Sequence, residues 1–312
     1  MTIIKIESIE TQPIVDAINN LIKEPTFFDM YMFPIISWII AFGTGWLLAN
    51  MGFNKQLKHQ RKKEKLERKH QKKKIKLEME KEKLFASNNL LLSIIEAFNA
   101  LTAYKNVYLH AVDTHPINRV FNIPYNDNNH KPIDFMISTL SFLVYKKKDY
   151  ISGTWVDIIR VSNLIKNYNY FLLLFDERNK LILETHEILL SSEKKKASIS
   201  KLPDYYLKEV GPLKLTYLID RTEQLINLVD NLILEIRDFF LNFRTDVKHV
   251  IDLKFLKMYD FNLFTYDLSK NEQLDKILKK STELDYQEAS KITGRKPEEM
   301  KENYTKGFLP ID

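Results

Sequence analysis

Apolar and polar positions are segregated along this chain, and the sharpest boundary lies near residue 53. Residues 30–53 (MYMFPIISWIIAFGTGWLLANMGF) run for 24 residues without a charged side chain. At 1.5 Å per residue, a helix of this length crosses a hydrocarbon core of roughly 30 Å. Tyr31 lies near the start of the run, where its amphipathic ring can reach the headgroup layer. The pattern therefore predicts a single transmembrane helix.

The next segment is strongly basic. Residues 54–77 carry twelve Lys or Arg against two Glu, whereas residues 1–29 carry two Lys against five acids. Basic flanks stay on the cytoplasmic side of a membrane helix. We therefore expect residues 1–29 to form a short extracytoplasmic N-terminus, and the chain from residue 54 onward to be cytoplasmic, at the inner or plasma membrane of the cell. A signal peptide is disfavoured, since its basic start and small-residue cleavage site do not occur in this sequence.

The formal net charge of +6 is the sum of unlike segments. It divides into about −3 for residues 1–29, about +10 for residues 54–77 and about −1 for residues 78–312. A nearly neutral body argues against a broad nucleic-acid-binding surface. The chain has no Cys, which excludes a disulfide framework and a thiolate metal site. Seven Gly and ten Pro in 312 residues offer few tight turns, which favours helices.

Residues 54–83 have too few apolar side chains to bury a helix face, so we expect a solvated helical stalk. Only its first cations lie close enough to the membrane to contact anionic lipid headgroups, because attraction to the surface fades within about 8 Å. These candidate membrane-surface contacts are Lys55, Lys58, Arg61, Lys62 and Lys63. Nucleic-acid binding by the stalk stays open but is not favoured, since no aromatic side chain is interleaved to stack on bases.

The pattern then changes to apolar stripes at helical spacing, and residues 84–260 read as one helical bundle. The first stripe consists of Leu84, Leu91, Ile94, Ile95, Phe98 and Leu101. Residues 115–132 are rich in Asn and Pro and predict an ordered loop or insertion. A shorter apolar helix is expected over residues 133–145, too short to span a membrane.

Two longer helices set the predicted architecture. Thr154 and Asp157 suggest a capping box before the first, whose residues follow a heptad pattern typical of coiled coils. One seam reads Ile158, Ile165, Leu172, Asn179 and His186, and its partner reads Val161, Tyr168, Phe175, Ile182 and Leu189. We interpret Asn179 and His186 as buried polar residues that set the register of the seam.

Gly211 and Pro212 are expected to open the second long helix. Its apolar positions recur every seven residues along three adjacent rows, which is wide enough for neighbours on two sides. The rows include Leu218, Leu225, Leu232, Phe239; Ile219, Ile226, Ile233, Phe240; and Val229, Ile236, Phe243, Val250. Long helices joined by loops predict an elongated antiparallel bundle with crossings near 20°.

Residues 261–312 read as a small C-terminal helical region, with short helices at about 271–292 and 297–304. Gly294 followed by Pro297 is typical of a helix that ends and restarts. A helix-turn-helix over residues 285–304, with phosphate contacts from Lys291, Arg295 and Lys296, is the less favoured reading of the same pattern.

The sequence offers little for metal or cofactor chemistry. His110, Asp113 and His115 are a sparse match to zinc ligands without a second half. No phosphate-binding loop, dinucleotide fingerprint or nucleophile elbow occurs in the sequence. We therefore expect no cofactor and no bound metal, and a non-enzymatic role is favoured.

Arg244 and His249 enclose four residues, Thr-Asp-Val-Lys. This R-x4-H spacing resembles that of HEPN domains, helical bundles that often cleave RNA. The resemblance covers six residues, and it implies that Arg244 and His249 would act at a phosphodiester, usually across a dimer. The alternative reading is that both are boundary residues beside Asp246 and Asp252.

Together these patterns predict an all-α protein: one N-terminal transmembrane helix, a basic stalk and an elongated antiparallel bundle. The favoured function is a membrane-anchored interaction or scaffold protein that confines a cytoplasmic assembly to the bilayer, as a homo-oligomer or with a protein partner. In layout the chain also resembles membrane-anchored bacterial antiphage effectors, which assemble or perturb the bilayer when triggered. A tethered HEPN-like ribonuclease is the third reading.

Overall fold

The computed structural model describes residues 13, 15–17, 27–125, 130–143, 153–191, 202–268 and 272–306. These residues form helices and connecting segments without a β-strand, which confirms the all-α prediction. The chain divides into two compact units, Met1–Ile75 and Lys76–Asp312. Most of the predicted extracytoplasmic N-terminus, and the last residues of the helix expected over 133–145, lie outside the described residues.

The first unit is dominated by the start of a long helix. A π-helical turn, η1 (Phe28–Met32), leads into α2 (Phe33–Tyr108), and α2 belongs to the first unit as far as Ile75. Pro34 is tolerated because it lies in the first turn, where its missing N–H needs no partner. The helix contains a run that is long and apolar enough to cross a membrane, and none of that run is buried.

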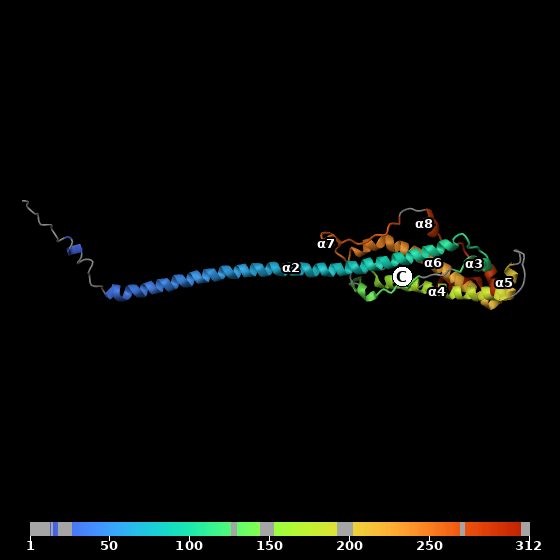
Figure 1. The fold of residues 1–312 in the computed structure, drawn as a ribbon, viewed down its shortest axis with the longest axis horizontal. Coiled ribbons are helices and arrows are strands. Elements are labelled where there is room, and N and C mark those ends of the chain that lie inside the picture. Colours follow the sequence, from blue (N-terminus) through green and yellow to red (C-terminus); the bar gives the residue numbers. More distant parts are fainter. Residues whose placement is uncertain are drawn as a thin grey trace, which may run out of the picture. The chain divides into compact units, whose positions relative to one another are not determined.

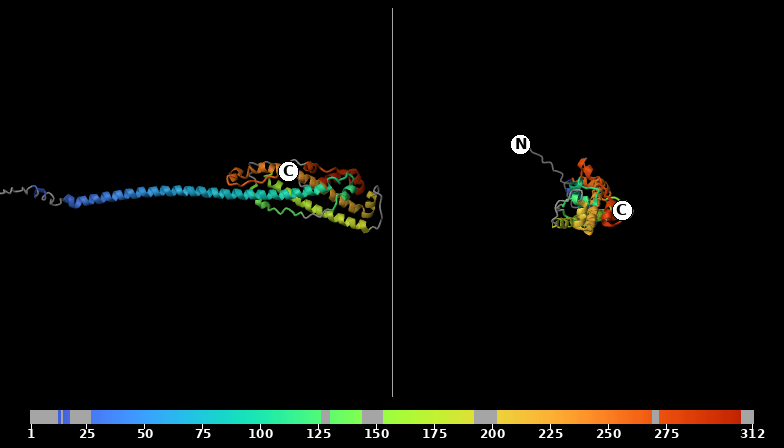
Figure 2. Two further views of the ribbon diagram at one scale, coloured as in Figure 1. Left: turned by 45° about the horizontal axis from the view of Figure 1, so that its top comes forward. Right: turned by 90° about the vertical axis from the view of Figure 1, so that its right-hand side faces the viewer.

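The second unit contains the rest of α2 and the remaining helices. Along the chain they are α3 (Pro116–Asn122), the 3-10 helix η2 (Ile137–Leu143), α4 (Ile158–Ser191), α5 (Leu202–Val210), α6 (Pro212–Val247), α7 (Leu253–Lys257), α8 (Glu272–Ile277), α9 (Tyr286–Thr293) and α10 (Pro297–Lys306). Figures 1 and 2 show α4 and α6 running beside the last part of α2.

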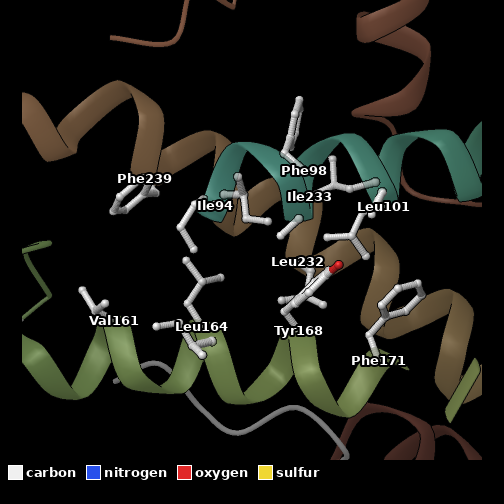
Figure 3. Close-up of a cluster of buried hydrophobic side chains, with 14 of the residues drawn as sticks. Ile94, Phe98, Leu101, Val161, Leu164, Tyr168, Phe171, Leu232, Ile233 and Phe239 are labelled. Carbon is white, nitrogen blue, oxygen red and sulfur yellow. The ribbon is translucent and has the colours of Figure 1, made fainter. Parts of the chain in front are cut away.

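The main core lies between α2, α4 and α6. Ile94 and Leu101 of α2 lie on the side that faces α4, whereas Phe98 points to the other side of α2 and its ring meets Phe240 of α6 (Figure 3); all three are buried. From the other two helices the core receives Val161, Leu164, Tyr168, Phe171, Leu232, Ile233 and Phe239. Aromatic rings meet edge to face within it, for example Phe98 with Phe240 at 5.4 Å between centroids. The stripe predicted on α2 and the rows predicted on α6 from Leu225 onward therefore contribute to the core, whereas Leu218 and Ile219 belong to a separate cluster with Val120 and Ile182.

The seam predicted on α4 is half right. The row Val161, Tyr168, Phe175 and Ile182 is buried, but the row beside it is Leu164, Phe171, Arg178 and Thr185. Asn179 is buried as expected, whereas His186 is exposed, so its prediction as a buried register-setting residue is wrong. The reason is geometric: α4 packs against both α2 and α6, and its buried face is centred one residue earlier than the assumed heptad.

The predicted helix starts and ends are confirmed in some places and wrong in others. Gly211 with positive φ before Pro212, and left-handed Gly294 ending α9, are confirmed. The capping box is wrong, because α4 begins at Ile158 and the Asp157 carboxylate accepts the Ile159 N–H at 2.8 Å. The segment predicted as a loop contains α3, and the helix expected from residue 133 is instead η2 in its described part.

Candidate functional site

The apolar segment (residues 30–53) exposes an unusual amount of hydrophobic surface. From Phe33 to Phe53, twelve large apolar side chains are exposed, with Trp38 and Phe42 each 76% accessible. Burying one such side chain contributes about 1.5–3 kcal/mol, so this surface is unfavourable in water. A contiguous exposed apolar surface marks a site for contact with membrane or protein.

The hydroxyl groups of Ser37 and Thr44 in this segment are already satisfied within the helix. Ser37 Oγ donates to the Phe33 carbonyl at 2.7 Å, and Thr44 Oγ1 donates to the Ile40 carbonyl at 2.8 Å. Every unsatisfied polar group in hydrocarbon costs several kcal/mol. The internal bonds therefore remove this penalty for both hydroxyls, and they suit the segment to an apolar solvent.

The basic segment (residues 54–75) follows on the same helix. Lys55, Lys58, Arg61, Lys62 and Lys63 are all exposed, so each is free to meet an anionic surface. At 100° per residue, Lys55, Lys58, Lys62, Lys65 and Lys69 fall on one face, whereas Lys63 falls on the other side, near Glu64 and Glu67. The i, i+3, i+7 spacing of lysines produces the first face, which our sequence reasoning missed. The Arg68–Glu64 pair at 3.9 Å is exposed and contributes little.

Arg244 and His249 lie near the end of α6. Arg244 is in its last turn, but the helix ends at Val247, so His249 is in the following turn and the two are not on one helix. Both side chains are exposed, and the buried Phe243 and Val247 lie on the core side of the same stretch. The His249 N–H donates to the Asp246 carbonyl at 3.1 Å, consistent with a helix boundary.

A cluster of buried charges lies at the other end of the core. Lys105 of α2 pairs with Asp230 of α6 at 2.6 Å, and Arg119 of α3 pairs with Glu223 of α6. Burial raises the pKa of Glu223 to about 7, against the opposing effect of the Arg119 charge. Nothing in the sequence pattern predicted this cluster. Its four residues, from three helices, are at most 5% exposed, so they link these helices and lack the access that a substrate needs.

Arg178 is a further buried cation that sequence reasoning missed. Its guanidinium donates to the carbonyls of Val120, in the last turn of α3, and of Ile123 and Pro124, which follow the helix. A cation at the C-terminus of a helix meets its partial negative charge. Arg178 therefore positions α3 against α4.

One groove of about 570 Å³ lies between α2 and the segment that precedes η2. Glu96, His130, Lys131, Asp134 and Tyr168 line it. Burial, with a smaller effect of Glu96, raises the pKa of Tyr168 to about 12, so its phenol stays protonated. Burial lowers the pKa of His130, so its imidazole is neutral near pH 7. The groove combines both signs of charge.

The described residues hold no group of three or more His, Cys, Asp or Glu side chains that could bind a metal ion. The carboxylate of Asp113 instead accepts hydrogen bonds from Asn118 and from the Thr114 N–H, at 3.0 and 2.6 Å. No family model, no curated protein and no solved structure matches the chain.

Proposed function

We propose that this protein is a single-pass membrane protein that confines a helical interaction domain to the cytoplasmic face of the membrane. One observation carries the proposal: α2 presents an uncharged, fully exposed apolar segment and then an exposed basic segment, and its last part supplies core residues to the helical domain. The apolar segment, the basic segment and the part of α2 that enters the domain core thus follow one another along a single helix.

The basic segment supports the orientation. Lysines that follow a transmembrane helix directly are retained in the cytoplasm, and each cation near an anionic surface contributes about 1 kcal/mol. Lys55, Lys58 and Lys62 are exposed on one face and close in sequence to the apolar segment. We propose that they contact anionic headgroups, whereas the later lysines keep the helix solvated.

The role is proposed to be a scaffold that acts through a second copy of the chain or through another protein. In the apolar segment, Ala41, Gly45 and Ala49 recur every four residues, and a Cβ added at Gly43 or Gly45 would meet nothing within 4 Å in the isolated helix. Faces of small residues let membrane helices approach closely. An antiparallel bundle on a helical stalk is the architecture we propose for such a scaffold. The stalk predicted over residues 54–83 is solvated only in its first part, because Leu77 packs against the main core and Glu80 is buried.

Membrane insertion is tested by placing charges in the apolar segment. Full-length Ile40→Asp/Leu47→Lys is expected to leave the alkali-washed membrane fraction, in which the wild-type chain remains, because each central charge costs about 2.5–3.5 kcal/mol. The matched control is Leu173→Lys, the same kind of change at an exposed leucine of α4. Loss of the wild-type chain on alkaline washing would refute an integral span.

Orientation is tested with single cysteines, since the natural chain has none. In intact cells a membrane-impermeant maleimide is expected to label Ser8→Cys and not Gln71→Cys, and both are expected to react after lysis. The opposite labelling would invert the topology and place the helical domain outside the cytoplasm.

A further inference from the structure

The C-terminal hairpin (residues 279–306) contains α9 and α10, and it has a core of its own. Leu284, Ala289, Met300 and Tyr304 are buried together, with Tyr286 packed against them. This cluster is separate from the main core, whose last contribution from this side is Ile277 of α8. Left-handed Gly294 ends α9 so that α10 can fold back on it. The hairpin can therefore keep its internal packing when its position changes.

Its attachment at the four-charge site (Lys105, Arg119, Glu223 and Asp230) is polar and involves mainly main-chain groups. Lys105 Nζ donates to the Lys279 carbonyl at 2.5 Å, and Arg119 donates to the Thr282 carbonyl at 2.6 Å. The Ser281 N–H and hydroxyl both donate to the Asp230 carboxylate, at 2.6 and 3.1 Å. Buried cations and a buried carboxylate thus both make hydrogen bonds to residues 279–282.

A second attachment point lies on α6. Asp220 accepts hydrogen bonds from Arg295 at 2.7 Å and from the Tyr304 hydroxyl at 2.8 Å. Asp285 also donates its N–H to the Thr114 carbonyl at 2.9 Å. Among apolar groups, Ile292 is partly buried against the small cluster that contains Ile219. Directional polar bonds therefore hold the hairpin at this second point, beside the apolar contact of Ile292.

The polar attachment of the C-terminal hairpin lowers the free energy needed to separate it from the four-charge site. With the hairpin docked, Lys105, Arg119, Glu223 and Asp230 are 1%, 2%, 2% and 5% exposed. When these charges are exposed again, water replaces their hydrogen-bond partners. Separating a polar contact therefore costs much less free energy than breaking the same hydrogen bonds would cost without water. An apolar contact of the same area would lose its full burial energy.

We propose that the C-terminal hairpin is a reversibly docked module, which leaves the four-charge site as a unit while the core of α2, α4 and α6 stays folded. The turn at Leu278 and Lys279, which follows α8, is the hinge. Release presents two cations and two carboxylates to solvent; of these, Lys105 and Arg119 bind main-chain carbonyls in the docked state, and Asp230 binds a main-chain N–H. The device belongs to the helical domain and does not depend on membrane insertion.

Hydrogen exchange of the full-length chain in detergent tests this proposal. We expect the amides of α9 and α10 to share one opening event and to exchange at least tenfold faster than those of α6 between Leu225 and Phe239, which need global unfolding. Exchange of both regions at one common rate would overturn the proposal, because the hairpin would then open only when the whole domain does.

Two substitutions separate docking from internal stability. Asp220→Asn weakens the Arg295 contact and is expected to raise hairpin opening about tenfold, the equivalent of one hydrogen bond to a charged group, with α4 and the α6 core unchanged. The control is Glu283→Gln, which removes an exposed pair with Lys301 inside the hairpin and is expected to change nothing. An unchanged hairpin in Asp220→Asn would also overturn the proposal; if that variant does not fold, the wild-type rates decide.

Discussion

At the scale of single residues, the distinctive feature is charge placed where apolar side chains would be expected. Lys105 and Arg178 are among the largest fully buried side chains of the described residues, next to Trp155 and Tyr104. A buried ion is tolerated only when partners replace its water, and here carboxylates and helix-end carbonyls do so. These residues specify how α3 and the C-terminal hairpin attach to the core.

Glu223 makes the domain sensitive to pH. Its pKa is raised from 4.5 to about 7, chiefly by burial, so the folded state binds a proton that the unfolded state releases between these values. The stability of the domain therefore falls as pH rises from about 4.5 to about 7, and it levels off above. The largest possible loss is about 3 kcal/mol.

Thermal unfolding of the full-length chain in detergent at pH 5, 6, 7 and 8 measures this effect. The melting temperature of the wild type is expected to fall with pH relative to Glu223→Gln, which cannot ionise. Glu283→Gln serves as the control, because Lys301 lowers the pKa of the exposed Glu283 and its titration lies below this range. Parallel pH profiles for the wild type and Glu223→Gln would contradict the prediction.

At the scale of helices, the sequence carried more information. The rows of α6 and the α2 stripe were predictable because an apolar face repeats with the helical period wherever a helix borders a core. The α4 seam was not fully predictable, since the choice between Ile165 and Leu164 as its centre depends on which neighbours the helix meets. Lys105, Arg119 and Asp230 gave no periodic signal at all, because their partners lie far away in sequence.

The apolar segment of α2 makes a prediction about association. If two copies meet through the face of Ala41, Gly45 and Ala49, Gly45→Leu separates the backbones and weakens association about tenfold, or about 1.4 kcal/mol. Gly43→Leu is the matched control, since both positions leave room for a side chain within one helix and residue 43 lies on another face. Cross-linking in vesicles reports the dimer fraction, and equal effects of both substitutions would exclude this face as the contact.

At the scale of the whole molecule, the distribution of basic residues along the chain helps to decide between a ribonuclease and a protein-binding scaffold. The basic residues concentrate in residues 54–77, and the remainder of the chain after them is close to neutral. A ribonuclease built around Arg244 and His249 would need RNA to approach the end of α6. Arg244, Lys248 and His249 are exposed there, but Asp246 lies among them with a half-buried side chain. The nearly neutral charge of the chain after residue 77 argues against a broad surface for a polyanion, so we favour a protein partner.

The mass of the detergent-solubilised full-length protein, measured together with its nucleic-acid absorbance, decides between these readings. We expect a complex of more than one polypeptide without nucleic acid, because the proposed scaffold would act through a second copy or a partner. A closed assembly of several copies would favour the effector reading and make membrane permeability the next measurement. Bound RNA that is lost in Arg244→Ala/His249→Ala would instead support the ribonuclease, whereas a lone monomer free of RNA would contradict the scaffold as proposed.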